Sequence, residues 1–380
     1  MIRMAAAVVG AILVAASGAT AGADDSEICR NYQAMLKTDP ASAVSACRRL
    51  AEQGDGWGQF TLGLMYDFGD GVPQDYTEAL KWYSKAADHN FARAQYYVAN
   101  MYYYGDGAPR SYDEALKWLS KAADLGFSEA QRTIGMMHRD GTGLPRNFAE
   151  AAKWFRMAAD QGNALAQTNL GALYNDGSGV PQNYAEAMKW YRKAAAQGEV
   201  LAEKNLGTMY DEGRGVPIDD IEAVKWYRKA AERGFAAAQT NLGVMYNAGE
   251  GVTLDYAEAA KWHQRAAAQG LALGQFNLGT MYYLGDGVPR DLVQAYKWSA
   301  LAAITFPPGQ NRENAVNNRD VFAKEMSQAE LAEARRLVLE WKAKPELRYQ
   351  TINIRYCNKR DPQSSCDKPV PIAVPVQLDY

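Results

Sequence analysis

The dipeptide Lys-Trp occurs seven times in this chain of 380 residues, each time 36 residues after the previous copy. The surrounding sequence is repeated as well, because "KWFRMAADQG", "KWYRKAAAQG" and "KWYRKAAERG" stand in consecutive copies. Self-similarity at a fixed period of this size is typical of solenoid arrays, and it replaces the expectation of two or three globular domains that the length alone would give. The repeated tryptophans are Trp82, Trp118, Trp154, Trp190, Trp226, Trp262 and Trp298.

The first half of one copy, residues 164–199, has the pattern of an amphipathic helix. Ala166, Leu170 and Leu173 are spaced i, i+4 and i+7, which places them on one helical face. The segment "NDGSGVPQN" follows, and its glycines, aspartate and proline predict a turn that ends this helix.

The second half of the copy has its own start and stop signals. Asn183 stands three residues before Glu186, which is the pairing of an N-cap with a capping-box glutamate. Gly198 lies where a helix favours a left-handed residue after its last turn. Each copy is therefore predicted to be a helical hairpin. The same N-cap pairing recurs at Asp75/Glu78, Ser111/Glu114, Asn147/Glu150, Asp219/Glu222, Asp255/Glu258 and Asp291/Gln294. The same terminal position holds Asn90, Gly126, Gly162, Gly234 and Gly270.

The repeated tryptophan is interpreted as a packing element, not as a catalytic or ligand-binding residue. A two-helix hairpin cannot bury both of its faces, so neighbouring hairpins must stack on it. A buried tryptophan removes about 150–250 Å² from water, which is among the largest contributions one side chain can make. A second column of small residues would let helices approach closely, and its members are Gly63, Ala99, Gly135, Gly171, Gly207, Gly243 and Gly279.

The seven copies span residues 57–304. The sequence on either side of them predicts capping elements. Residues 24–56 keep the register, with Ala46 at the tryptophan position, and are interpreted as a degenerate capping repeat. Residues 305–341 contain a helix that opens with a Ser327/Glu330 capping box and carries Leu331, Ala334, Val338 and Trp341 on one face. In the tail, 342–380, "YQTINIRYC" alternates like a strand and the proline-rich end is expected to be extended.

Residues 1–23 have the features of a secretory signal peptide. Arg3 precedes the apolar run "MAAAVVGAILVAA", and small residues follow, with cleavage fitting after Ala21 or Ala23. The alternative, an uncleaved anchor, is disfavoured because the run is shorter than the roughly 20 residues that a span needs. No later segment is long enough to span a bilayer, so we expect a mature protein that is periplasmic or secreted.

The four cysteines lie outside the seven copies, near the two ends of the chain. In an oxidising compartment an even count predicts two local disulfides, Cys29 with Cys47 and Cys357 with Cys366. The first would close a loop of about 19 residues, worth roughly 3 kcal/mol in the chain-entropy model. We expect no metal site, because none of the three histidines has ligand spacing to a cysteine pair.

Charge gives no case for a nucleic-acid or anionic-membrane partner. The chain has 41 basic and 44 acidic residues, spread along its length, for a net charge of −3. An electrostatic footprint for such partners would need a concentrated basic surface.

The hairpin unit in residues 202–234, "A-x-x-x-L-G-x-M-Y-x-x-G-x-G-V-P" followed by "E-A-x-K-W-Y-x-K-A-A-x-x-G", closely resembles the Sel-one-like repeat, a relative of the tetratricopeptide repeat. The resemblance covers residues 57–304 strongly and the flanking caps more weakly. It implies an all-α fold, a right-handed α/α superhelical solenoid of about eight hairpins, whose concave surface binds other proteins. Copy six departs from the pattern with Thr253 in place of the loop proline, and copy two has Ala108 for the loop valine.

Two motifs resemble parts of catalytic sites, and both are interpreted as structural or accidental. The G-x-G in each loop lies between helices and recurs in every copy, whereas a phosphate cradle follows a strand and occurs once. Ser365 to Lys368 fits S-x-x-K but lacks the partner motifs of an acyl-transfer site. We therefore expect no catalytic residues, no cofactor and no enzyme activity.

Positions where the copies disagree are more informative about partners. Several copies carry extra aromatic or aliphatic residues at the end of the first helix, and packing does not require them in every copy. Exposed tyrosines are enriched at binding hot spots. The candidate partner-binding residues are Phe68, Tyr103, Tyr104, Tyr283 and Leu284. The alternative is that these side chains pack against the neighbouring loop.

The leading functional hypothesis is a non-enzymatic scaffold or adaptor that binds one or more proteins or peptides in the cell envelope or outside the cell. The alternatives are an envelope hydrolase or β-lactam-binding protein, and a regulator of such an enzyme.

Overall fold

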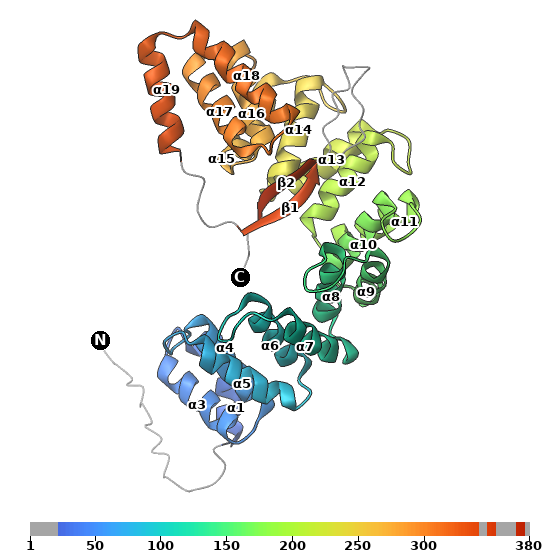
Figure 1. Cartoon of the computed structure of the whole chain (residues 1–380), viewed down its shortest axis with the longest axis vertical. Coiled ribbons are helices and arrows are strands. Elements are labelled where there is room, and N and C mark those ends of the chain that lie inside the picture. The colour runs from blue at the N-terminus through green and yellow to red at the C-terminus, as the bar shows by residue number, and fades with distance from the viewer. Residues whose placement is uncertain (1–21, 342–347, 355–369, 377–380) are drawn as a thin grey trace, which may run out of the picture. The chain divides into compact units, whose positions relative to one another are not determined.

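A computed structural model describes residues 22–341, 348–354 and 370–376, and within these ranges every element except two short strands is a helix (Figure 1). The helices form two compact units that divide between Arg146 and Asn147. The all-α solenoid expected from the sequence is confirmed, because helical pairs repeat through both units. The first unit contains α1 Gly22–Arg30, α2 Tyr32–Met35, α3 Pro40–Glu52, α4 Gly56–Phe68, α5 Tyr76–Asp88, α6 Ala92–Tyr104, α7 Tyr112–Asp124 and α8 Ser128–Asp140. The second contains α9 Phe148–Asp160, α10 Ala164–Asp176, α11 Tyr184–Ala196, α12 Val200–Glu212, α13 Asp220–Glu232, α14 Ala236–Ala248, α15 Tyr256–Ala268, α16 Ala272–Leu284, α17 Leu292–Thr305, α18 Gln310–Glu325 and α19 Gln328–Glu340.

We number the hairpins from one (α4–α5) to seven (α16–α17) and call their helices first and second. Each helix from α4 to α16 has 13 residues, so the frame is uniform. Within each unit, a second helix contacts both its own first helix and the first helix of the next hairpin. The helices of hairpin three, α8 and α9, fall in different units.

The second helices have the predicted N-cap side-chain bonds, but in most hairpins the capping-box glutamates do not bond as predicted. The N-cap side chain accepts a backbone hydrogen bond in each, for example from Glu186 N to Asn183 Oδ1 at 3.1 Å. The other half of the predicted capping box, a hydrogen bond from the N-cap N–H to the glutamate side chain, is wrong in hairpins one, two, four, five and six. There the N-cap N–H donates to a first-helix carbonyl, as from Asn183 to Tyr174 at 2.9 Å. The glutamate therefore turns outward and pairs with the lysine three residues on. The complete box does form at Ser327 and Glu330.

All six predicted left-handed residues have positive φ, and Asn90, at φ 58°, is the one among them that is not glycine. The column of small residues on the first helices has the predicted role. A Cβ built on Gly207 would lie 2.5 Å from the ring of Tyr227, so only glycine permits this approach. The equivalent contact in hairpin four is between Gly171 and Tyr191, at 2.7 Å.

The repeated tryptophans pack at the junction between consecutive hairpins. Trp262 lies in one cluster with Tyr227 of the preceding second helix and with Leu242 and Met245 of its own first helix. Burial is unequal, since Trp118, Trp154 and Trp226 are only half-buried. The residue that follows each tryptophan is buried in all seven hairpins. These residues are Tyr83, Leu119, Phe155, Tyr191, Tyr227, His263 and Ser299.

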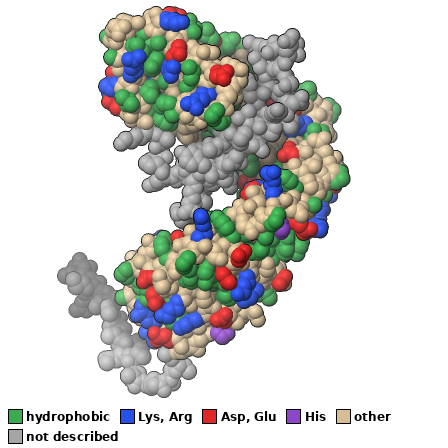
Figure 2. Space-filling view, in the orientation of Figure 1, with side chains coloured by type: hydrophobic (Ala, Val, Ile, Leu, Met, Phe, Trp, Pro, Cys, Tyr) green, Lys and Arg blue, Asp and Glu red, His purple; other side chains and the backbone are tan. Residues whose placement is uncertain are grey.

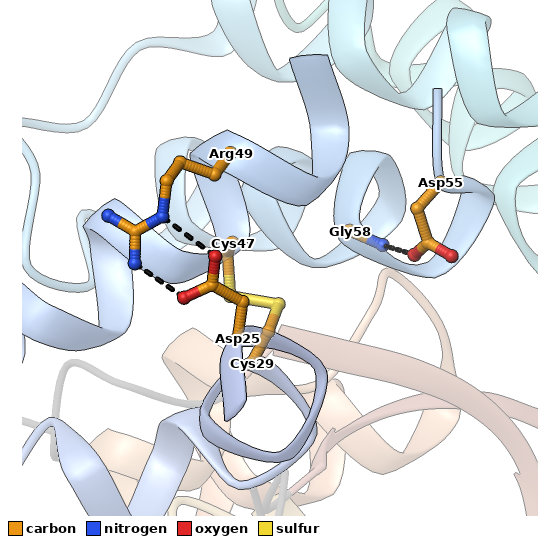
Figure 3. The surroundings of a disulfide bond; sticks show 6 residues. All are labelled: Asp25, Cys29, Cys47, Arg49, Asp55 and Gly58. Atoms are coloured by element: carbon orange, nitrogen blue, oxygen red, sulfur yellow. Dashed lines mark hydrogen bonds and ion pairs between the residues drawn. A yellow bond between two sulfur atoms is a disulfide. The ribbon is translucent and has the colours of Figure 1, made fainter. Parts of the chain in front are cut away.

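At the N-terminal end, α1 packs on α3 and the sulfurs of Cys29 and Cys47 form a disulfide (Figure 3). Beside it, the Arg49 guanidinium pairs with Asp25 and lowers the pKa of that carboxyl group. Residues 1–21 of the expected signal peptide and the second predicted cysteine pair, Cys357 and Cys366, lie outside the described residues.

At the C-terminal end, α18 and α19 both contact α17. Val338 and Trp341 pack on Trp298, and the two indole rings meet edge-on at 6.4 Å, so α19 covers hairpin seven with the predicted face. Strands β1 Arg348–Ile354 and β2 Val370–Val376 pair antiparallel, with Ile352 opposite Ile372. The strand predicted from alternation is confirmed, and part of the proline-rich end is its partner.

Candidate protein-binding surface

The first helix of each hairpin has a half-exposed face on which the copies differ. The position occupied by Thr208 in hairpin five is Ala172 in hairpin four and Val244 in hairpin six. The buried positions of the first helices, in contrast, change little; one of them is leucine in five hairpins, with Val98 and Ile134 in the other two. We call this the first-helix face. A surface that varies on a constant frame is what a client-specific binding site needs.

One half-exposed position on this face does not vary in the second unit. It is asparagine in four consecutive first helices, and the residues are Asn169, Asn205, Asn241 and Asn277. The four side chains remain half-exposed, although Asn205 also bonds Lys204 and Tyr191 within the chain. An asparagine side chain offers both a donor and an acceptor, which matches the two hydrogen-bonding groups of a peptide unit. The row was missed from the sequence because only the leucine and the small residue that follow each asparagine were interpreted, as packing positions.

Side-chain hydrogen bonds link neighbouring hairpins of this unit, and link the last hairpin to the cap. Arg214, just beyond the end of α12, donates to Asn175 of α10 across 3.4 Å. At the other end of the row, Asn318 of the cap helix α18 donates to Thr280 of α16, also across 3.4 Å. These bonds link hairpin five to hairpin four and the cap to hairpin seven.

Hairpin five carries charge where the other hairpins carry amides. In hairpin four, Gln167 donates to the carbonyl of Ala159 and accepts from Gln197, at 3.0 and 2.9 Å. The residue at the Gln167 position in hairpin five is Glu203, fully buried, whose carboxylate pairs with Lys229 at 3.0 Å and Arg233 at 3.5 Å. The same junction is thus built from ions instead of neutral hydrogen bonds.

Lys204, next to that glutamate, is an almost fully buried lysine. Burial lowers the pKa of its ammonium group to about 8, opposed by the charge of Glu212. Its Nζ donates to Asn205 Oδ1 at 3.3 Å, which joins it to the asparagine row. Hairpins four and six have the neutral Thr168 and Thr240 at this position.

His263 replaces the buried tyrosine in hairpin six. Burial lowers the pKa of its imidazole to about 4, and neither ring nitrogen has a hydrogen-bond partner. In hairpins one and five the tyrosine hydroxyl donates to the first helix, as from Tyr227 to Asp211 at 3.2 Å. The equivalent acceptor in hairpin six, Asn247 Oδ1, is buried without a donor because the imidazole has no hydroxyl to reach it.

The sequence-predicted aromatic candidates divide into two groups. Phe68, Tyr104 and Leu284, each the last residue of a first helix, are 53–59% exposed. Tyr103 is half-buried, with its ring 5.2 Å from the ring of Tyr112. Phe68 and Tyr104 occupy equivalent places on neighbouring hairpins of the first unit, whereas Leu284 belongs to the second unit.

Tyr283 has an internal partner. Its ring stacks on Phe322 of α18 at 4.3 Å, and its hydroxyl donates to Glu325 at 2.6 Å. Arg290 also bonds Glu325, at 2.6 Å, and closes the contact. The aromatic at this position therefore docks the C-terminal cap helix, and not the neighbouring loop that the packing alternative named.

Neither a metal site nor a membrane-spanning helix is found in the part of the chain that the structure describes. No group of three or more His, Cys, Asp or Glu side chains there could hold a metal ion. No helix within those ranges is both long and apolar enough to cross a membrane.

The Sel1 repeat matches residues 58–91, 92–127, 128–163, 164–199, 200–235, 236–271 and 272–304. A search of curated proteins found no match. A Sel1 repeat protein from Oxalobacter formigenes is 32% identical over 83% of this chain and 88% of its own, with a TM-score of 0.62. A protective antigen of uropathogenic Escherichia coli with an SLR fold is 30% identical over 83% and 82%, with a TM-score of 0.42. With seven matched repeats over most of its length, the chain belongs to the Sel1 repeat family.

Proposed function

We propose that this protein is an exported, non-enzymatic scaffold that binds an extended segment of a partner protein along the first-helix face of its second unit. Sel1 repeat proteins generally act as protein-interaction scaffolds. The observation that carries the more specific proposal is the row of half-exposed asparagines, Asn169 to Asn277, at the same position of four consecutive first helices.

The spacing of the row suits an extended chain. An extended strand rises about 3.3 Å per residue, so one partner segment can run past several hairpins and meet successive asparagines. The variable residues between them, such as Thr208 and Val244, would then select the side chains of that segment.

Export is supported by two observations. The apolar run after Arg3 and the small residues that follow it have the pattern of a secretory signal. The Cys29–Cys47 disulfide fits an oxidising compartment, where such bonds persist. We propose the periplasm or the exterior as the destination, and fractionation of cells that produce the full chain tests this.

The binding proposal is tested with purified protein on an array of nine-residue peptides. We expect a subset of extended peptides to bind, and the double variant Asn241→Ala/Asn277→Ala to lose at least about tenfold in affinity because two bidentate contacts disappear. Helicity and melting should be unchanged, since neither amide belongs to the core.

The matched control is Lys225→Ala/Lys261→Ala, which removes two exposed second-helix side chains. It should leave peptide binding intact. Equal losses in both variants would contradict the assignment to the first-helix face. Turnover of a β-lactam or a peptidoglycan fragment, lost on a single polar substitution, would favour the enzyme alternative instead.

A further inference from the structure

The loop before each second helix carries a position whose chemistry changes in hairpins five and six. In hairpins one, four and seven this residue donates a hydrogen bond to a carbonyl near the end of the first helix. The bonds run from Gln74 to Asp67, from Gln182 to Asn175 and from Arg290 to Tyr283, at 2.7, 2.8 and 2.9 Å. Such a bond satisfies one of the carbonyls that a helix leaves unpaired at its C-terminus.

Hairpins five and six have Ile218 and Leu254 at this position, and neither side chain can donate. Both lie over the terminal glycine of their first helix, since a Cβ on Gly213 would be 2.8 Å from Ile218 and one on Gly249 3.1 Å from Leu254. They are nevertheless 62% and 48% exposed. The exchange forfeits a hydrogen bond worth about 1 kcal/mol and presents aliphatic surface to water, so folding does not favour it.

A third exposed aliphatic residue follows Ile218 by three positions. Ile221 in the first turn of α13 is 60% exposed, whereas hairpins four and six have alanine at the same place. The loop of hairpin six touches the start of α13 there, because a Cβ on Gly251 would lie 2.2 Å from the Asp220 carbonyl and 2.8 Å from the Ile221 nitrogen. We call Ile218, Ile221 and Leu254 the loop-edge patch. Elsewhere, on the visible face of the first unit, hydrophobic side chains are interspersed with both signs of charge (Figure 2).

The surroundings of the loop-edge patch are acidic. Asp219, Asp220 and Asp255 flank it in the sequence, while the nearby glutamates Glu222 and Glu258 already pair with lysines of their own helices. Asp220 Oδ1 is shielded from water and has no hydrogen-bond partner. An aliphatic surface bordered by carboxylates is complementary to aliphatic side chains accompanied by cations.

We propose that the loop-edge patch is a second docking surface, which binds a partner segment that presents aliphatic side chains next to lysine or arginine. It is formed by loops and second-helix starts, so it is separate from the first-helix face and does not depend on the peptide-binding proposal. Its aliphatic residues would enter the partner's apolar surface while the aspartates meet the partner's cations.

The chain itself supplies a variant that should not disturb folding. In Ile218→Gln/Ile221→Ala/Leu254→Gln, each new residue is the one that hairpin four has at that place. The glutamines can restore the bonds to the first-helix carbonyls, so melting temperature should be equal to or above that of the native protein. A lower melting temperature would show that the three residues are structural and would overturn the proposal.

Binding is measured by fluorescence anisotropy with two designed probes, a twelve-residue peptide of alternating leucine and lysine and its glutamate counterpart. We expect the lysine peptide to bind at least about tenfold more tightly, with affinity falling as salt is raised. The triple variant should lose this binding, and Asn241→Ala/Asn277→Ala should keep it.

The matched control is Leu125→Gln, which removes another exposed leucine, 51% exposed, in favour of the glutamine that hairpins three, four and six have there. It should bind like the native protein. Equal binding of both peptides, or equal loss in the control, would contradict the proposal. A native dimer that the triple variant abolishes would identify a second copy of this chain as the occupant and overturn the assignment of a basic partner.

Discussion

Hairpins four and five have the same frame but different contact chemistry. Their helices have the same lengths, their buried tyrosines lie against the same glycine position, and their N-caps bond the same backbone group. Yet the neutral residues Gln167 and Thr168 of hairpin four are replaced in hairpin five by Glu203 and Lys204. The difference teaches that close helix approach fixes the repeat, while the junctions and exposed faces are free to change.

The frame itself should respond to the largest perturbation, and in both hairpins alike. Gly171→Val and Gly207→Val each force a branched side chain into the buried tyrosine ring, so each should lower the free energy of unfolding by about 3 kcal/mol. Urea denaturation measures this. Ala172→Val, one residue away on the half-exposed face, is the control and should cost much less. Tolerance of one glycine substitution but not of the other would break the claim of a shared frame.

Hairpin six extends the comparison to a buried ionisable residue. The pKa of His263 is about 4 in the folded protein and about 6.5 when unfolded, so the unfolded state binds more protons between these values. Stability is therefore full above pH 6.5 and falls as pH drops, with a loss of up to about 3 kcal/mol below pH 4.

The variant His263→Tyr should lack this increment of acid sensitivity. Its hydroxyl can also donate to Asn247, as Tyr227 donates to Asp211 in hairpin five, so stability at pH 7 should rise. Unfolding of both proteins at a series of pH values measures the difference. Parallel pH profiles would show that His263 is protonated or solvated in the folded state.

One ion pair of Glu203 in hairpin five can be removed by one substitution, and both can be replaced by a neutral hydrogen bond with a second. Arg233→Gln removes one of two cations from a buried carboxylate and should destabilise by about 2 kcal/mol. Adding Glu203→Gln recreates the glutamine pair of hairpin four, so the double variant should recover native stability. Additive losses in the double-mutant cycle would refute the equivalence of the two junctions.

Lys204→Thr should have the smallest effect, an increase of about 1 kcal/mol in the free energy of unfolding at pH 7. The variant no longer buries a cation, but it also loses the hydrogen bond to Asn205, which offsets most of the gain. The pKa of Lys204, about 8, is below its unfolded value of about 10.4, so native stability rises as pH increases from 8 to 10. The threonine variant lacks that rise, and its advantage should shrink over this range. A constant advantage would mean that Lys204 titrates normally.

The sequence predicted the frame well because its signals are local. Asn183 and Gly198 mark helix ends by backbone requirements that act within a few residues. The glutamate half of the capping box failed because the N-cap N–H is taken by the carbonyl of Tyr174, nine residues earlier, which a local motif does not reveal. The tryptophan was given the central packing role, although the residue after it is more consistently buried.

The binding surfaces were less predictable because they depend on exposure. Tyr103 and Tyr283 look alike in sequence, yet only the structure shows that Phe322 of the cap covers Tyr283. The loop-edge patch did have a sequence signal, since Ile218 departs from a column of glutamine and arginine. Its meaning required the hydrogen bond that Gln182 makes to the first helix.

The most direct test of the scaffold claim is photo-crosslinking in cells that export the protein. A photoreactive residue is placed at Val244 on the first-helix face and, as a control, at Lys261 on the opposite, second helix. We predict one dominant protein partner from position 244, lost when Asn241→Ala/Asn277→Ala is added and absent from position 261. The same capture from both positions, or capture at 244 that the asparagine substitutions do not affect, would contradict the account.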